Sequence, residues 1–470
     1  MVIMDYKKYL CPDMKQMERL FCATALALCF LVLTGAKRPV GHDSQEASDP
    51  SYSLVGHTFA GFPVGLALCS NGDRQYVGFY DEDRRMTVAQ RTLPDGPWKY
   101  VRLDSRIGWD SHNYITMKVD SRGALHVSGN MHVQYLVYFC TDETGEIETL
   151  HRLDSLVGDR ETRMTYPSFI MLPDKRLIFH YRYGKSGNGE EIYDICDREG
   201  RWSRYLDTPL TDGKGLMNAY MSTPRLGSDK FYHMVWVWRN SPDCATNHDL
   251  CYAKSPDLKH WFTAAGEALE LPISIDEKRV LVDPVPCGGG MLNGGPCVGL
   301  DGLKRPVISY FKYDEGGNTQ VYVARYEDGG WRTAKVSGFR NFRWELHGGG
   351  SIVRRFWVFT PQFDSKGRLS VGYRRYDPGT EKRTERRIII DGDSLRPICE
   401  KPVRDRTLPS WFNELQSDFA PDMLVKQASD TGGTRFGVYR LRWECLPQNR
   451  DREVKRPIPE PSEVRVVKIR

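Results

Sequence analysis

The sequence lacks the features of several common classes of protein. It has no long segment with helical periodicity and no run of basic residues of the kind that binds nucleic acid. It also has no HExxH metal motif, no Gly-x-Ser-x-Gly turn and no glycine loop for phosphate. The net charge of the 470 residues is only +5, which suits an acidic ligand without requiring one. These features argue against a helical protein and against nucleic acid as a partner.

Only one apolar run suggests a targeting segment. Residues 21–34 are apolar, follow Lys15 and Arg19, and precede two small residues. Because the run is short for a membrane span, the pattern indicates a signal peptide. The sequence therefore predicts a cleaved leader over residues 1–36, a secreted or periplasmic protein, and no membrane contact after cleavage.

Cysteine is sparse outside the leader. Nine of the 12 cysteines follow residue 36, at wide and irregular spacings. Small secreted proteins that depend on disulfides have denser cysteines. An odd number also leaves at least one thiol without a partner in the same chain. The sequence therefore implies no dense disulfide framework.

Alternation of apolar and polar residues with a period of two dominates residues 52–445. An apolar hairpin and a more polar hairpin recur every 50–75 residues or so, which gives four strands to each unit. Seven such units predict an all-β, seven-bladed β-propeller with four antiparallel strands in each blade. A large β-sandwich or a β-solenoid is the alternative. The apolar tips are expected near Asn71-Gly72, Arg122, Asp174, Gly227-Ser228-Asp229, Asp301-Gly302, Lys366-Gly367 and Gly432-Gly433.

The repeats also set the expected boundaries. We expect a linker over residues 37–50, the propeller over residues 51–446, and a charged C-terminal tail over residues 447–470 that forms a surface extension. The last unit lacks an obvious fourth strand, and residues 51–58 could supply it and close the ring. The protein is expected to be a monomer.

Two histidines are arranged symmetrically about one predicted tip. His112 and His132 each lie ten residues from Arg122. Side chains that oppose each other across an antiparallel pair have β-carbons about 4.5–5.5 Å apart. The two imidazoles are therefore expected to face one small volume.

The next apolar hairpin repeats this arrangement with different side chains. Tyr166 and Arg182 each lie eight residues from Asp174, so we expect them to oppose each other. Both pairs would lie at the same end of neighbouring hairpins. A one-residue bulge would break this register.

These four residue types suit one reaction, the removal of a proton beside a uronate carboxylate. Arg182 could pair with the carboxylate and acidify that proton. A neutral His112 could accept the proton, and Tyr166 could protonate the departing glycosidic oxygen or share the role of base. His132 could be a second partner of the carboxylate. The alternative is that all four residues serve packing or the surface.

Other residues near these hairpins are candidates for sugar contacts. Residues 186–189 either bring backbone amides to a sugar or form a simple turn. Trp236 and Trp238 are either core aromatics or a platform for a sugar. The candidate substrate-binding residues are Asn113, Asn130, Asn188, Tyr220, Arg239 and His248.

One further cluster has the spacing of a small metal site. Cys244, His248 and Cys251 could hold a structural zinc or calcium, completed by a residue distant in the sequence. No fourth ligand is evident, and a role in the core is the alternative. Catalysis by the four residues above requires no cofactor.

Seven blocks of the chain form a recognisable set: GDRQYVGFYD (72–81), RRMTVAQR (84–91), GWDSHNYITMKVDSRGALHVSGNMH (108–132), TYPSF (165–169), FHYRYGKSGNGE (179–190), NHDLCYAKSPDLKHW (247–261) and RWELHGGGSI (343–352). They resemble the BNR-4 group of secreted carbohydrate-active propellers. The likeness runs through nearly all of the chain after the leader, and the SHNY, SGNMH and YR-GKSGNG blocks are specific.

The resemblance implies both a fold and an activity. The group includes seven-bladed ulvan lyases, which cleave rhamnosyl–glucuronate or iduronate linkages by β-elimination. It implies that His112 and Tyr166 are the base and acid, and that Arg182 and His132 neutralise the carboxylate. The expected function is a polysaccharide lyase, and the expected partner is an acidic, ulvan-like polysaccharide or oligosaccharide.

One departure from the group bears on the alternatives. Relatives that are α-L-rhamnosidases act on rhamnose-capped glucuronate of arabinogalactan, and they have a histidine just before a Pro-Val-Gly on the opposite face. Here Phe62 occupies that position, and His57 lies nearby without matching it. The departure weakens the prediction of a rhamnosidase. A non-catalytic glycan-binding propeller is the third hypothesis.

Overall fold

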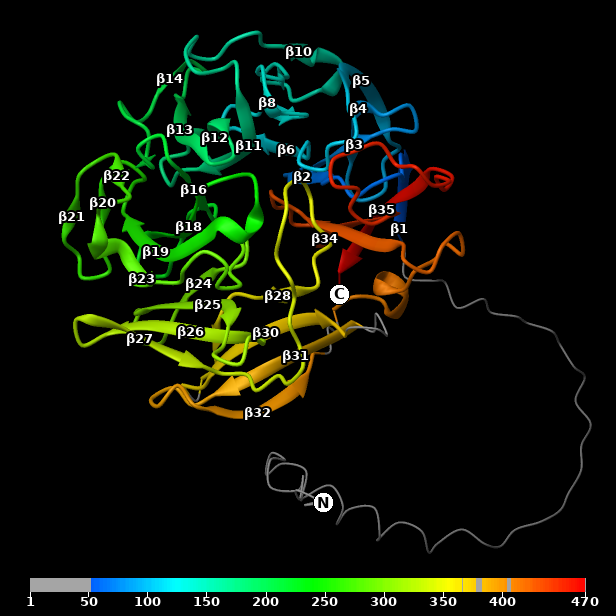
Figure 1. Ribbon diagram of the computed structural model, residues 1–470. Helices are drawn as coiled ribbons and strands as arrows, with labels where there is room; N and C mark the ends of the chain where they lie inside the picture. The colour runs from blue at the N-terminus through cyan, green and yellow to red at the C-terminus, as the bar shows by residue number, and fades with distance from the viewer. Residues whose placement is uncertain (1–51, 366, 378–382, 404–406, 470) are drawn as a thin grey trace, which may run out of the picture.

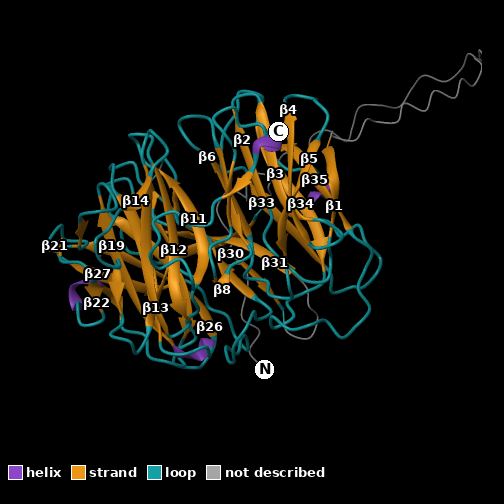
Figure 2. Cartoon of the chain, turned by 90° about the horizontal axis from the view of Figure 1, so that it is seen from above, coloured by secondary structure: helices purple, strands orange, loops and turns teal. Residues whose placement is uncertain are grey.

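The computed structural model describes residues 52–365, 367–377, 383–403 and 407–469. The predicted leader (1–36) and linker (37–50) lie outside these ranges. Within them, the sheets follow one another in chain order around a common centre, which makes the fold an all-β propeller (Figure 1). Strands and turns make up nearly all of the described chain (Figure 2). The helical turns are η3 (Ile147–Thr149), η4 (Cys244–Thr246), η5 (Lys278–Val280) and η6 (Ser410–Asn413).

The first sheets in the chain are antiparallel and use strands that are close in sequence. One contains β2 (Ala67–Asn71), β3 (Arg74–Tyr80), β4 (Arg85–Thr92) and β5 (Lys99–Arg106). The next contains β6 (Ile115–Val119), β7 (Leu125–Gly129), β9 (Tyr138–Cys140) and β10 (His151–Arg152). The third contains β11 (Met164–Met171), β12 (Leu177–Lys185), β13 (Asn188–Cys196) and β14 (Trp202–Arg204), and its edge is extended by β8 (His132–Gln134).

The following sheets continue around the ring. One contains β16 (Asn218–Met221), β17 (Arg225–Leu226), β18 (Tyr232–Arg239), β19 (Asn247–Ser255), β20 (Trp261–Phe262), β21 (Ala268–Leu269) and β23 (Leu281–Asp283). The next contains β24 (Cys297–Leu300), β25 (Pro306–Tyr313), β26 (Thr319–Glu327) and β27 (Gly330–Lys335). Then come β28 (Phe356–Val358), β29 (Gln362–Phe363), β30 (Leu369–Tyr376), β31 (Arg383–Ile390) and β32 (Pro397–Pro402). A separate parallel pair consists of β15 (Thr211–Asp212) and β22 (Ile273–Ser274).

The last sheet joins the two ends of the described chain. It contains β33 (Leu424–Ser429), β34 (Val438–Cys445), β35 (Ser462–Ile469) and β1 (Tyr52–Thr58), in the order β1-β35-β34-β33. The expectation that an N-terminal strand completes the last unit is therefore confirmed. The prediction of a surface tail over residues 447–470 is wrong, because β35 lies between β34 and β1 and buries Val464 and Val466. Charged residues before the strand hid this short apolar alternation.

The predicted hairpin tips follow from aspartate side chains that hold the turns. Val119 pairs with Leu125, which centres that turn on Arg122 as expected. The Asp120 carboxylate accepts hydrogen bonds from the backbone N–H groups of Arg122 and Ala124, at 2.9 and 3.0 Å. Carboxylates favour such turns because they satisfy backbone donors that the ladder leaves free. Asp301 accepts in the same way from the residues two and four positions along the chain.

The core lies between neighbouring sheets. One apolar cluster combines Val55 and Trp443 of the closing sheet with Tyr76 and Val127 of the next two sheets. Trp236 and Trp238 are only 1% exposed within another cluster, which settles their role as core aromatics. Six of the nine cysteines of the described ranges are buried free thiols. No helix in these ranges is long and apolar enough to cross a membrane.

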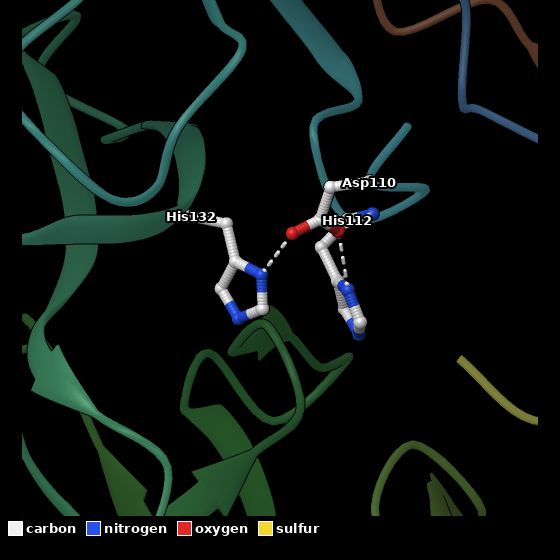
Figure 3. Close-up of side chains that lie close together, drawn as sticks. All are labelled: Asp110, His112 and His132. Carbon is white, nitrogen blue, oxygen red and sulfur yellow. Dashed lines mark hydrogen bonds and ion pairs between the residues drawn. The ribbon is translucent and has the colours of Figure 1, made fainter. Parts of the chain in front are cut away.

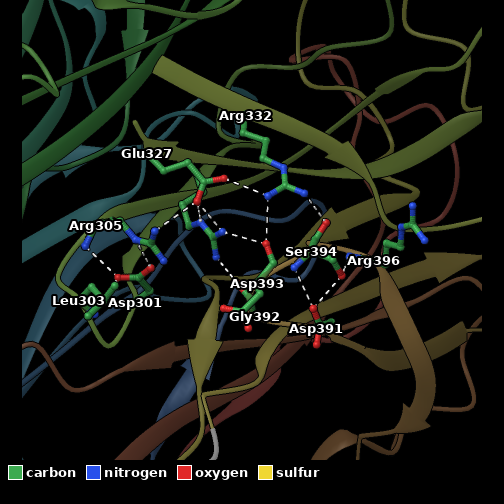
Figure 4. A network of polar contacts seen from close by, with 11 residues as sticks. Asp301, Leu303, Arg305, Glu327, Arg332, Asp391, Gly392, Asp393, Ser394 and Arg396 are labelled. Carbon is green, nitrogen blue, oxygen red and sulfur yellow. Dashed lines mark hydrogen bonds and ion pairs between the residues drawn. The ribbon is translucent and has the colours of Figure 1, made fainter. Parts of the chain in front are cut away.

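A polar network also joins two neighbouring sheets (Figure 4). The Glu327 carboxylate accepts hydrogen bonds from Arg305, Arg325 and Arg332, at 3.2, 2.9 and 3.1 Å. Arg332 also donates to the carbonyl oxygens of Asp393 and Ser394 in the turn that follows β31, at 2.9 and 2.8 Å. The network therefore attaches the β24–β27 sheet to its neighbour.

Candidate functional site

His112 and His132 lie next to each other. Their ring centroids are 4.4 Å apart, with an angle of 38° between the ring planes. The ladder between β6 and β7 ends at the pair Ile115–Gly129, so the histidines are not cross-strand partners as predicted. His112 lies in the turn before β6, whereas His132 opens β8 and pairs with Thr165 of the neighbouring sheet. The predicted proximity is present, but it comes from two sheets.

Asp110 bridges the two imidazoles (Figure 3). The Nδ1 atom of His112 lies 2.7 Å from Asp110 Oδ1, and the Nδ1 atom of His132 lies 2.5 Å from Asp110 Oδ2. An ionised carboxylate only accepts hydrogen bonds, so both Nδ1 atoms are donors. Each Nε2 atom is therefore the nitrogen left for a substrate. Sequence reasoning missed Asp110, although its place two residues before His112 was the available signal.

Asp451 is a second carboxylate at His112 that sequence reasoning missed. Its Oδ2 atom lies 3.3 Å from His112 Nδ1, and its side chain is 13% exposed. It lies in the segment between β34 and β35, which was expected to be a surface tail. No local sequence pattern connects residues so far apart in the chain.

The two carboxylates control the protonation of His112. Burial by itself lowers the pKa of His112, but the hydrogen bonds and charges of Asp110 and Asp451 outweigh burial and raise the pKa to about 9. Burial works to raise the pKa of the Asp110 carboxyl, but its hydrogen bonds to both histidines hold that pKa well below its usual range. His112 is therefore protonated at neutral pH while Asp110 is ionised.

Tyr166 approaches the histidines through a β-bulge. Thr165 pairs with Arg182 and Ser168 pairs with His180, so two residues between them are unpaired, and Tyr166 does not oppose Arg182 as predicted. Tyr166 has a φ of 58°, which turns its side chain out of the ladder. Its ring centroid lies 5.9 Å from that of His112. The bulge therefore places the phenol beside the imidazoles.

Arg182 lies beneath two tyrosines. Its guanidinium carbon is 4.8 Å from the ring centroid of Tyr166 and 5.6 Å from that of Tyr220. Its Nη1 atom donates to the Tyr220 hydroxyl at 3.1 Å, whereas Nε and Nη2 have no partner although the residue is only 1% exposed. Burial raises the pKa of Tyr166 above its usual value, and the charge of Arg182 opposes that rise. Two N–H donor groups of Arg182 thus lie next to the phenol without a hydrogen-bond partner.

Arg239 also lies next to Tyr220, with its guanidinium carbon 5.2 Å from the ring centroid. Its Nε donates to the Ser241 carbonyl at 2.9 Å, and Nη1 donates to Asn293 at 3.2 Å. Nη2 bonds the Pro242 carbonyl. Arg239 is therefore fixed by its loop, and it supplies positive charge to Tyr220 and not a free donor.

The other predicted substrate-binding residues differ in their burial and in whether their side chains already have hydrogen-bond partners. Asn113 is buried, and its Oδ1 atom has no partner. The Asn130 side chain is already bonded to Ser105 and to the Arg106 carbonyl. Asn188 is exposed at the start of β13. His248 is held by Asn240 and Asp249, at 2.8 and 3.1 Å.

The predicted metal site is not assembled. Cys244 packs in one apolar cluster and Cys251 in another, because Cys244 lies in η4 and Cys251 points into the core from β19. His248 between them is bonded to its own neighbours. Within the described ranges, Asp110, His112 and His132 are the one group of three such side chains whose ligand atoms lie within 4.8 Å of one another. The Nδ1 atoms of both histidines already donate to Asp110, so the three side chains form a hydrogen-bonded triad.

Comparisons with solved structures identify the same architecture elsewhere. A polysaccharide lyase, Uly1, superimposes with a TM-score of 0.59 at 12% identity, over 89% of this chain and 98% of that one. An ulvan lyase of family PL25, bound to -[GlcA(1-4)Rha3S]-, superimposes with a TM-score of 0.58 at 12% identity, over 89% of this chain and 96% of that one. At these identities the likeness concerns the fold.

Sequence comparisons assign the chain to a family. A search of curated proteins found no match. The model of a family described as "BNR repeat-containing family member" matches residues 74–338, which is more than half of the chain and includes His112, His132, Tyr166 and Arg182. The chain therefore belongs to the BNR_4 repeat family.

Proposed function

We propose that this protein is a polysaccharide lyase that cleaves rhamnose–uronate linkages of an acidic, ulvan-like polysaccharide by β-elimination. The observation that carries the proposal is the meeting of His112, His132 and Tyr166 above a buried arginine. The fold that the chain shares with two polysaccharide lyases is consistent with it. The family match and the fold by themselves do not identify the substrate.

The proposed reaction removes the proton on C5 of the uronate. Nε2 of deprotonated His112 accepts that proton, the electron pair forms the C4–C5 double bond, and the bond between C4 and the glycosidic oxygen breaks. The Tyr166 hydroxyl donates its proton to the departing oxygen. The products are an unsaturated uronate and a new free hydroxyl, so atoms and charges balance without a cofactor.

Positive charge beneath the tyrosines supports this chemistry. The developing negative charge lies on the uronate carboxylate, which Arg182 and His132 would neutralise. Nε and Nη2 of Arg182 are free to donate, but they are covered, so direct contact requires Tyr166 or Tyr220 to shift when the substrate binds. Without such a shift, the guanidinium acts through space on the phenol and the carboxylate.

Three further features belong to the proposal. We propose that the ring has seven blades, with each sheet of four or more strands taken as one blade and with β1 and β35 in the last one. We also propose that the protein is secreted or periplasmic and acts as a monomer, on the basis of the apolar run at residues 21–34 and the self-contained ring.

The test is incubation with ulvan and, separately, with gum arabic. A rise in ultraviolet absorbance indicates elimination, because the unsaturated uronate absorbs. We expect His112→Ala and Tyr166→Phe each to lower the rate at least about 100-fold, since a general acid or base contributes about 10²–10⁴-fold. Asp422→Asn, on an exposed carboxylate that pairs with Arg456, is the control and should keep full activity.

The other outcomes select other functions. New reducing ends without absorbance would indicate a hydrolase such as the α-L-rhamnosidase alternative. Binding without either signal would indicate a glycan-binding propeller. Phe62, which occupies the position of the histidine of those rhamnosidases, is only 1% exposed and packs in the core, and this favours the lyase.

A further inference from the structure

Asp451 reaches His112 from the segment that closes the ring. Besides its contact with His112, its Oδ1 atom accepts hydrogen bonds from the backbone N–H and the hydroxyl of Ser111, at 3.3 and 3.2 Å. Its Oδ2 atom accepts from the backbone N–H of Ser351, at 2.9 Å. One carboxylate therefore ties together three loops that are far apart in the sequence.

The loop that carries Asp451 is strained to place it there. Arg450 and Asp451 both have a φ of 58°, a conformation that residues other than glycine rarely adopt. The segment is held by Asn449, which donates to the Trp109 carbonyl at 2.7 Å. Such strain persists only where surrounding contacts impose it, and it gathers at functional sites.

The facing loop is shaped to fit this segment. Gly350 has a φ of 72°, and a Cβ atom there would lie 2.7 Å from the Arg450 carbonyl oxygen and 3.1 Å from Asp451 Oδ2. The Arg450 side chain in turn donates to the carbonyl oxygens of His347 and Gly349, at 3.3 and 3.2 Å. A side chain at position 350 would therefore collide with the segment that carries Asp451.

We propose that Asp451, which lies in the segment between β34 and β35, is a positioning residue for His112. Together with Asp110, it keeps the imidazole proton on Nδ1 and directs Nε2 toward the substrate. The role as an aid to catalysis rests on the function proposed above. The effect of Asp451 on the tautomer and pKa of His112 does not rest on that function, because it is a property of the protein without substrate.

Other charged groups also face His112 and bear on its titration. Asp110 belongs to the same loop as His112, His132 comes from β8, and Tyr166 comes from β11 with Arg182 behind it. The two carboxylates favour the imidazolium, whereas the positive charge of Arg182 opposes it. Removing Asp451 alone leaves Asp110 in place, so we expect a partial change.

The first test is nitrogen NMR of the full chain labelled with ¹⁵N-histidine, with His112 assigned from the spectrum of His112→Gln. In the wild type, we expect the neutral form to carry its proton on Nδ1. In Asp451→Asn, we expect the pKa of His112 to fall by about one unit, the size of effect that a single neighbouring charge commonly has. Glu453→Gln, an exposed carboxylate two residues along, is the matched control and should change nothing.

The second test is the dependence of kcat and KM on pH for the same variants. When kcat is plotted against pH, we expect Asp451→Asn to move the rising limb of the curve to lower pH and to lower its plateau about tenfold. KM should stay within about twofold of the wild-type value. Asp451→Glu keeps the charge, so its rising limb should lie close to that of the wild type. A purely structural contact would lower the melting temperature of both variants without moving the limb.

Defined outcomes would overturn the proposal. It fails if wild-type His112 carries its neutral proton on Nε2, a result that needs no variant to fold. It also fails if Asp451→Asn leaves both the His112 resonances and the limb unchanged. If the wild type eliminates no polysaccharide but the NMR results are as expected, the proposed function fails and the positioning of His112 stands.

Discussion

At the scale of residues, the site has carboxylates next to the histidines and guanidinium groups next to the tyrosines. Asp110 and Asp451 place negative charge next to His112, and Arg182 and Arg239 place positive charge next to Tyr220. A base and an acid can coexist next to each other only if their surroundings favour different protonation states. Burial provides this difference, because it raises the pKa of Tyr166 above its usual value, so the phenol keeps its proton at a pH where His112, with a pKa of about 9, has lost one.

The first prediction concerns the pH dependence of activity. Because the pKa of His112 is raised to about 9, the imidazole must lose a proton before it can act as a base, and this active form is depleted as pH falls. We expect kcat/KM to rise about tenfold per unit from about pH 7 toward 9 and to level above it. Steady-state rates across this range provide the measurement. A profile that levels near pH 6.5, the ordinary value for histidine, would contradict the assignment.

At the scale of elements, the sequence located hairpins well and side-chain register less well. The tips near Arg122 and Asp174 are where the alternation and the turn residues put them. The bulge at Tyr166 was not predictable, because it depends on contacts with another element. Thr165 accepts a hydrogen bond from the backbone N–H of Val133 in β8, and β8 leaves its own sheet to make this contact. Strand exchange of this kind has no local signature.

The polar network on Glu327 gives a prediction at this scale. The Glu327 side chain is 11% exposed and Arg325 is 3% exposed, so the ion pair is nearly buried. We expect Glu327→Gln to lower the free energy of unfolding by about 3 kcal/mol, because it leaves the buried guanidinium of Arg325 without its anionic partner. Thermal and denaturant unfolding measure the loss.

The matched control for this network is Glu199→Gln. Glu199 pairs with Arg201 at the surface, where both side chains are mostly exposed, and such pairs contribute about 1 kcal/mol or less. Equal stability of the two variants would show that the network does not hold the sheets together. Activity below the unfolding transition should be the same in both.

At the scale of the whole molecule, the ring depends on strands from both ends of the described chain. β35 pairs with β34 on one side and with β1 on the other, and its apolar side chains are buried. The segment that leads to β35 also carries Asp451. Closure of the fold and completion of the site therefore use the same part of the chain.

The prediction at this scale is a substitution within the closing strand. Val466 is 1% exposed, so Val466→Asp buries a carboxylate without a partner, and we expect it to lower the free energy of unfolding by at least about 3 kcal/mol. Lys468→Gln, at an exposed position near the end of the same strand, is the control. Circular dichroism during heating measures both. A Val466→Asp protein as stable as the control would mean that β35 is not needed for closure.

The sequence by itself determined the class of fold, because alternation with a period of two and turn residues are local properties. It also selected His112, His132, Tyr166 and Arg182, since their spacing from the tips puts them at one end of neighbouring hairpins. Only the tertiary structure decided how they meet. Asp451 reaches His112 because the ring closes on itself. Tyr166 reaches His112 because a bulge shifts the register of β11 and because β8 pairs with the neighbouring sheet. Both depend on packing between segments that are distant in the sequence, where local patterns carry no information.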